Sequence, residues 1–163
     1  KDTDTIYVTK EYRESKRTPI FHAAALKPWS GGTQWMPFAW PHDGLQHDKG
    51  SGEELAKQYR EQGLNMLGVR ATFEDGGNGV EAGLFEMLDR MQTGRLKVFN
   101  TCTKWMEEKR LYHRKDGKVV KLMDDLISST RYAIMMKRLA VQPANAYQED
   151  AGRYDIEYSV FGR

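Results

Sequence analysis

The sequence predicts an α/β fold, because short apolar segments alternate with amphipathic helical segments along most of the chain. Residues 80–91 carry the clearest helical pattern, with apolar side chains recurring at positions i, i+4, i+7, i+8 and i+11. The apolar stretches 66–73 and 96–99, on either side of it, have the length of strands. Strands alternating with helices at short spacing are typical of folds with a partly parallel sheet.

The N-terminal part of the chain gives three local signals. Residues 5–12 alternate apolar and polar side chains, which predicts a strand with one solvent-exposed face. Thr18 and Pro19 supply an N-cap and a proline at the first helical position, so we expect a helix over residues 20–26. The apolar run 35–40 predicts a strand that stays short because of its prolines.

The middle of the chain continues the alternation. Acidic residues at the start and Gly63 at the end predict a helix over residues 53–62. A strand over 66–73 and a glycine-rich loop precede the helix of residues 80–91. The further elements we expect are a strand over 96–99 and a helix over 101–111.

A hairpin and a last helix follow. Asp116-Gly117 between short flanks is a strong hairpin signal. The last helix is predicted from Asp124 to about Arg138, and residues 141–163 read as a polar C-terminal tail. At 100° per residue the helix places its side chains on two faces. The packed face holds Leu126, Ile127, Thr130, Ala133 and Ile134, and the outer face holds Asp124, Ser128, Arg131 and Tyr132, with Asp125 near its edge.

Composition narrows the classes of function. The 163 residues suit one domain, with 39% hydrophobic and 29% charged residues and a net charge of +2. Cys102 is the only cysteine, which excludes an internal disulfide and a cysteine-based zinc cluster. The sequence contains neither an apolar run of membrane-spanning length nor a phosphate-binding P-loop motif.

Three carboxylates are candidates for chemistry. Asp43 follows the apolar run 35–40, and Asp124 and Asp125 begin the last helix. A carboxylate at a strand tip and a pair at a helix start can converge on Mg²⁺, which prefers oxygen ligands. For the pair alone, the simpler interpretation is that acids in a first helical turn stabilise the helix. Residues 104–121 carry seven Lys or Arg against three acids, which favours contact with phosphates. Carboxylates that can hold metal ions, together with a basic segment that can bind a phosphate backbone, suggest a metal-dependent nuclease.

Four motifs in this order make the chain resemble a known family. They are Trp40-Pro41-His42-Asp43-Gly44, residues 80–88, residues 112–121, and Asp124-Asp125-Leu126 followed by Arg131-Tyr132-Ala133. The chain resembles the C-terminal nuclease domain of the large terminase subunit of tailed bacteriophages, of the headful-packaging type. The resemblance covers nearly all of residues 1–140. It implies an RNase H-like (RuvC/integrase-like) mixed sheet flanked by helices, in a domain that cuts concatemeric viral DNA with Mg²⁺ or Mn²⁺.

The resemblance also assigns residues. Asp43 matches the carboxylate at the end of the fourth strand of that fold, and Asp124 and Asp125 match the acidic pair on its last helix; all three are expected to be catalytic metal ligands. The basic hairpin matches one thought to lie near DNA, and its expected DNA-binding residues are Arg114, Lys115, Lys118 and Lys121. Implied partners are double-stranded DNA, the portal protein and the small terminase subunit, in the host cytoplasm and without a membrane.

The sequence departs from the family pattern in one feature, and this departure leads to an alternative function. Family members carry a first catalytic aspartate on a central first strand, whereas residues 1–8 resemble the third strand. We therefore expect a sheet that lacks its first strands and a two-metal site that lacks one ligand. The alternative function is a catalytically incomplete module that docks on DNA or on the portal. In either case residues 1–140 form the nuclease-like domain and residues 141–163 the tail.

Overall fold

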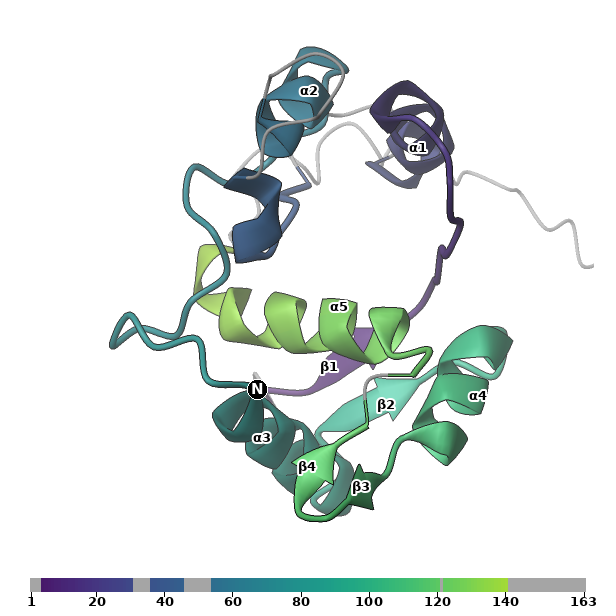
Figure 1. The fold of residues 1–163 in the computed structure, drawn as a ribbon, viewed down its shortest axis with the longest axis vertical. Coiled ribbons are helices and arrows are strands. Elements are labelled where there is room, and N and C mark those ends of the chain that lie inside the picture. The colour runs from purple at the N-terminus through teal and green to yellow at the C-terminus, as the bar shows by residue number, and fades with distance from the viewer. Residues whose placement is uncertain (1–3, 31–35, 46–53, 121, 141–163) are drawn as a thin grey trace, which may run out of the picture.

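The computed structural model describes residues 4–30, 36–45, 54–120 and 122–140 (Figure 1). Strand β1 (Ile6–Val8) pairs in parallel with β2 (Leu96–Val98), with Ile6 opposite Leu96 and Val8 opposite Val98. The predicted parallel pairing is confirmed, although β1 is much shorter than the predicted strand over 5–12. The tail 141–163 lies outside the described residues.

The helices follow the sequence signals closely. Thr18 caps α1 (Pro19–Leu26), because its Oγ1 accepts a hydrogen bond from the Phe21 N–H at 3.3 Å. Gly63 and Gly94 have φ angles of 85° and 71°, in the left-handed region that ends a helix without strain. The other helices are α2 (Leu55–Glu61), α3 (Val80–Gln92), α4 (Thr103–Leu111) and α5 (Asp125–Met135), with 3₁₀ turns η1 (Lys27–Ser30), η2 (His42–Leu45) and η3 (Lys137–Leu139).

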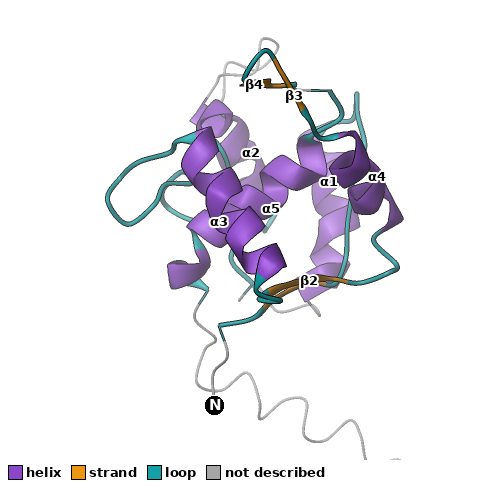
Figure 2. Cartoon of the chain, turned by 90° about the horizontal axis from the view of Figure 1, so that it is seen from below, coloured by secondary structure: helices purple, strands orange, loops and turns teal. Residues whose placement is uncertain are grey.

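The predicted strands 35–40 and 66–73 do not form in the described part of the chain. Phe38 and Met66 make a single parallel bridge, supported by a Phe38 N–H bond to the Asn65 carbonyl at 2.8 Å. Pro37 and Pro41 lack the N–H groups that a longer ladder needs, which limits pairing here. The sheet is therefore reduced to small pairs. Figure 2 shows the β1–β2 pair and the hairpin β3 (Arg114–Lys115) and β4 (Lys118–Val119) at opposite edges of the helices.

Helix α5 crosses the middle of the molecule, with α1 and α2 on one side and β1, β2, α3 and α4 on the other (Figure 1). Its predicted packed face is largely correct. Leu126, Ile127 and Ile134 join a core with Met87, Leu96, Cys102 and Trp105. Each such fully buried side chain stabilises the fold by about 1.5–3 kcal/mol.

Two positions of α5 correct the predicted faces. Ala133, expected on the packed side, is exposed, whereas Arg131, expected on the outer side, is only 5% exposed. The exposed face of the helix is a narrow stripe of Asp125, Ser129 and Ala133, shifted from the predicted outer face because the helix is packed on its other sides. Its end contributes Met135 to a second buried cluster with Ala71 and Met136.

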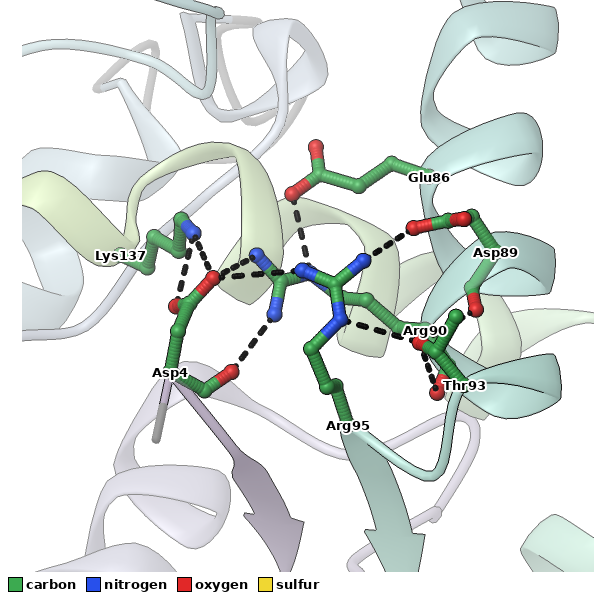
Figure 3. A network of polar contacts seen from close by, with 7 residues as sticks. All are labelled: Asp4, Glu86, Asp89, Arg90, Thr93, Arg95 and Lys137. Atoms are coloured by element: carbon green, nitrogen blue, oxygen red, sulfur yellow. Dashed lines mark hydrogen bonds and ion pairs between the residues drawn. The ribbon is translucent and has the colours of Figure 1, made fainter. Parts of the chain in front are cut away.

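A network of ionic contacts fastens the start of β1 to α3 and η3 (Figure 3). The Asp4 carboxylate accepts hydrogen bonds from Lys137 Nζ and from the buried Arg90 Nη2, both at 3.0 Å. Arg90 Nε also donates to Glu86 at 3.0 Å. The bonds from Lys137 and then Arg90 hold the pKa of Asp4 below its ordinary value.

None of the helices in the described ranges is long and apolar enough to cross a membrane.

Candidate metal and nucleic-acid site

The acidic pair lies where the chain turns into α5. Met123 has a φ angle of 52°, and Asp124 follows as the N-cap residue. The Asp124 carboxylate makes no capping bond; instead its Oδ2 accepts from the Ser128 hydroxyl at 3.3 Å. Asp124 is half-buried and Asp125 is exposed. The pair therefore stands at a helix N-terminus, as the sequence predicts.

A buried carboxylate from α4 closes this helix start in place of Asp124. Glu108 Oε2 accepts hydrogen bonds from the Leu126 N–H at 2.7 Å and the Ile127 N–H at 3.1 Å. Arg13 donates to Oε1 of the same carboxylate, whose side chain is 0% exposed. Charged residues on a helix are ordinarily expected on its solvated face; Glu107 is exposed, but Glu108 is buried. The spacing holds the missed signal, because Glu108 is one turn after the core residue Trp105 and shares its face.

The segment after β1 anchors α4 in the same manner. The Glu11 carboxylate accepts from the Lys104 N–H at 3.0 Å and the Trp105 N–H at 2.8 Å. The Trp105 indole then donates to the Thr130 hydroxyl on α5 at 2.9 Å. Residues 11–13 thus hold the start of α4 through Glu11 and the start of α5 through Arg13 and Glu108. This chain of contacts fixes the position of the acidic pair.

The three candidate carboxylates are not gathered together. Asp124 lines a cavity of about 330 Å³ with Ser128 and Arg131, whereas Asp125 lines another of about 330 Å³ with Arg13 and Lys104. Asp43 is exposed and lies on η2, which packs against α2. Within the described ranges, no three His, Cys, Asp or Glu side chains are grouped to hold a metal ion.

The aspartates have the right chemistry to bind a divalent metal ion, but their arrangement does not form a two-ion site. Carboxylate oxygens such as those of Asp124 and Asp125 are ligands that Mg²⁺ and Mn²⁺ prefer. A two-ion site needs carboxylates that hold both ions about 4 Å apart. The described arrangement does not meet this condition, since Asp124 and Asp125 line different cavities. The described side chains therefore form no two-ion site as they stand, and the metal-ligand roles of the three aspartates stay predictions.

The basic hairpin forms as predicted. Arg114 pairs with Val119 and Lys115 with Lys118, and the turn residues Asp116 and Gly117 have φ angles of 50° and 75°. Two positive φ angles define the tight turn that Asp-Gly favours, and they match the twist of the two strands. Lys121 falls outside the described residues.

The predicted DNA-binding side chains of the hairpin differ in availability. Lys115 and Lys118 are exposed. Arg114 is paired with Glu81 in the first turn of α3, with Nη1 3.0 Å from Oε1 and a second bond from Nη2 to Oε2. The hydrogen bonds from Arg114 hold the pKa of Glu81 below its ordinary value. The lysines are thus ready for phosphate contact, and Arg114 also attaches the hairpin to α3.

Comparison with known proteins identifies the family. The profile described as the terminase RNaseH-like domain matches residues 1–137. The large terminase subunit of Salmonella phage P22 is 49% identical over 141 residues, which cover 86% of this chain and 28% of the relative. The large terminase subunit of Enterobacteria phage LP7 is 49% identical over 138 residues, covering 84% of this chain and 28% of the relative.

A solved structure gives the same result for the fold. The nuclease domain of the P22 large terminase superposes with a TM-score of 0.77 at 49% identity, covering 86% of this chain and 71% of that one. By comparison, the chain spans about 28% of the length of the two curated large terminase subunits that it matches. Sequence and fold agree, and the chain belongs to the terminase RNase H-like domain family.

Proposed function

We propose that this chain is an endonuclease domain that cuts concatemeric viral double-stranded DNA during genome packaging. The observation that carries the proposal is its match, at 49% identity and a TM-score of 0.77, to the nuclease domain of the P22 large terminase. We further propose that cleavage requires Mg²⁺ or Mn²⁺. Asp43, Asp124 and Asp125 would hold the ions, and the hairpin lysines would bind the DNA backbone.

The partners and setting of the proposed function follow the family. Double-stranded DNA is the substrate, the portal protein and the small terminase subunit are the packaging partners, and the host cytoplasm is the location. The protein's part in the reaction is to bind and orient the DNA backbone. Lys115 and Lys118, on the hairpin that precedes α5 in the chain, are exposed and so available for that contact.

One observation favours a second candidate, a module that docks on DNA or on the portal without cutting. No three metal-ligating side chains are grouped within the described part of the chain. The docking module and the nuclease make opposite predictions for metal dependence. Both predict DNA binding that weakens as salt rises, because phosphate contacts release counterions.

Cleavage of supercoiled plasmid in Mn²⁺ separates the two functions. We expect the chain to nick the plasmid, and Asp124→Ala and Asp43→Ala to abolish nicking while DNA binding remains. Glu74→Ala, which removes an exposed carboxylate from the loop before α3, is the matched control and should cut normally. Salt-dependent binding without any metal-dependent nicking would contradict the nuclease and support the docking module. Undiminished nicking by both aspartate variants would contradict the assigned ligands.

A further inference from the structure

The cavity beside Asp124 has a second distinctive residue, Arg131. This cavity of about 330 Å³ lies between the start of α3 and the side of α5 that carries Ser128 and Arg131. Gly79 and Val80 line it from α3, Tyr112 from the end of α4, and Asp124 and Arg131 from α5. It therefore joins a candidate catalytic carboxylate to a buried cation.

Arg131 is buried against α3, and its printed partners within the described residues are both uncharged, although the Asp124 carboxylate lines the same cavity. Its residue is 5% exposed, and a Cβ built at Gly83 would lie 2.6 Å from both its Cγ and its Cδ, so its stem packs directly on α3. Its guanidinium lies 4.5 Å from the Tyr132 ring centroid, and its Nη1 donates to the Met135 thioether at 3.6 Å.

Neither of these partners carries a negative charge, and a thioether is a weak acceptor. Within the described residues, no carboxylate forms an ion pair with this guanidinium. A buried guanidinium whose only acceptor is a thioether leaves most of its N–H groups without a strong acceptor, so the cavity that it lines favours a group with acceptor oxygens.

The start of α3 supplies a second attraction for an anion. Gly79 is its N-cap residue and has no side chain to cap the helix, and the structure shows no side-chain capping bond. Gly79 and Val80 line the cavity, so the uncapped start of this 13-residue helix, with its free N–H groups and the positive end of its dipole, lies at the cavity wall. Helix starts of this kind bind phosphate groups readily.

We propose that this cavity binds one phosphate group of the DNA backbone, with the Arg131 guanidinium and the first N–H groups of α3 as donors. The assignment of DNA as the source of the phosphate rests on the proposed function. A planar guanidinium suits two phosphate oxygens at once. The bound phosphate lies beside Asp124, so the contact sets the register of the backbone relative to the acidic pair.

Backbone-amide NMR of the full chain in EDTA tests the site without any cleavage. We expect inorganic phosphate, and separately a short DNA duplex, to shift the amides of residues 78–81. Arg131→Met keeps a long apolar stem against Gly83 and removes the charge. It should weaken phosphate binding about tenfold or more. Arg17→Met makes the same charge change at an exposed site before α1 and should leave phosphate affinity unchanged.

A second variant separates binding from folding. Asn78→Asp places a negative charge at the exposed edge of the cavity, just before α3, where an acid stabilises the helix. The proposal expects a fold at least as stable and a loss of phosphate binding.

Unchanged phosphate affinity in both Arg131→Met and Asn78→Asp would overturn the site. Phosphate shifts at 78–81 without duplex shifts there would overturn DNA as its source. Because no metal is present, either result stands apart from the outcome of plasmid cleavage.

Discussion

Helices α5 and α3 lie against each other but begin in contrasting ways. The start of α5 is closed from outside, because Glu108 accepts the N–H groups of Leu126 and Ile127 and is itself bound by Arg13. The start of α3 has Gly79 as its N-cap and no side-chain capping bond, and it opens on a cavity.

The contrast separates two uses of the same physics. A carboxylate already satisfies the N–H groups at the α5 start, so this end holds the acidic pair in place. The N–H groups at the α3 start keep their capacity for an anion, and Arg131 adds a positive charge beside them. The start of α5 therefore holds the acidic pair in position, and the start of α3 is suited to ligand binding.

Removing the Glu108 carboxylate from the start of α5 should have the largest effect on the free energy of unfolding. Glu108→Ala leaves Arg13 without its partner and the buried N–H groups of Leu126 and Ile127 without an acceptor. Losing one partner of a buried ion pair costs about 3–5 kcal/mol of unfolding free energy. Urea unfolding followed by circular dichroism measures this loss.

The matched control for that variant is its neighbour in sequence. Glu107 is exposed on α4, so Glu107→Ala should change the unfolding free energy by less than about 0.5 kcal/mol. Equal losses in the two variants would show that Glu108 does not close α5 and would remove the contrast between the helix starts.

Pushing α3 away from Arg131 should have an intermediate effect. Gly83→Ala places a Cβ 2.6 Å from Arg131 Cγ and Cδ, both held in a packed interior. Overpacking of this kind costs about 1–3 kcal/mol, and the higher helix propensity of alanine returns about 1 kcal/mol. Gly68→Ala, where the new Cβ meets nothing within 4 Å, is the control in the same unfolding experiment. A Gly83→Ala variant more stable than the parent chain would show that the two helices are not held this closely.

Most helices and the hairpin could be predicted from the sequence, because their signals are local. Thr18-Pro19 fixes the start of α1, apolar spacing identifies α3, and Asp116-Gly117 specifies the turn. Each signal acts over a few residues and does not depend on the rest of the fold. The family was predicted from the order of its motifs and is confirmed.

The remaining features depend on contacts between distant segments. The strands 35–40 and 66–73 were overestimated because apolar length alone does not provide a partner strand. Glu107 and Glu108 have the same chemistry; the helical spacing places Glu108 on the face of Trp105, and the packing of α4 against α5 then buries it. Arg131 was assigned to the outer face of α5, but the exposed stripe is narrower and runs through Asp125, Ser129 and Ala133, which leaves Arg131 buried against α3. The metal-ligand roles of Asp43, Asp124 and Asp125 stay predictions.

The smallest expected effect is a change in DNA affinity on substitution of Glu81 at the start of α3. Glu81 lies in the first turn of this helix and pairs with Arg114. This pairing holds the pKa of Glu81 low, so its contribution is complete above the ordinary pKa and is lost only as pH falls below about 4. Glu81→Gln removes that charge at neutral pH and releases Arg114 toward DNA. We expect duplex affinity to rise about two- to fivefold.

Fluorescence anisotropy at fixed salt measures the Glu81→Gln change, with Glu107→Gln as a control that removes one exposed negative charge from α4. Net charge alone would raise affinity equally in both variants. A larger rise for Glu81→Gln, with a salt dependence steeper by up to about one phosphate contact, would show that the gain comes from Arg114 and the α3 start. Weaker binding by Glu81→Gln would mean that the Glu81–Arg114 pair holds the hairpin in its DNA-binding position, and that the α3 start is less open to anions than its missing cap implies.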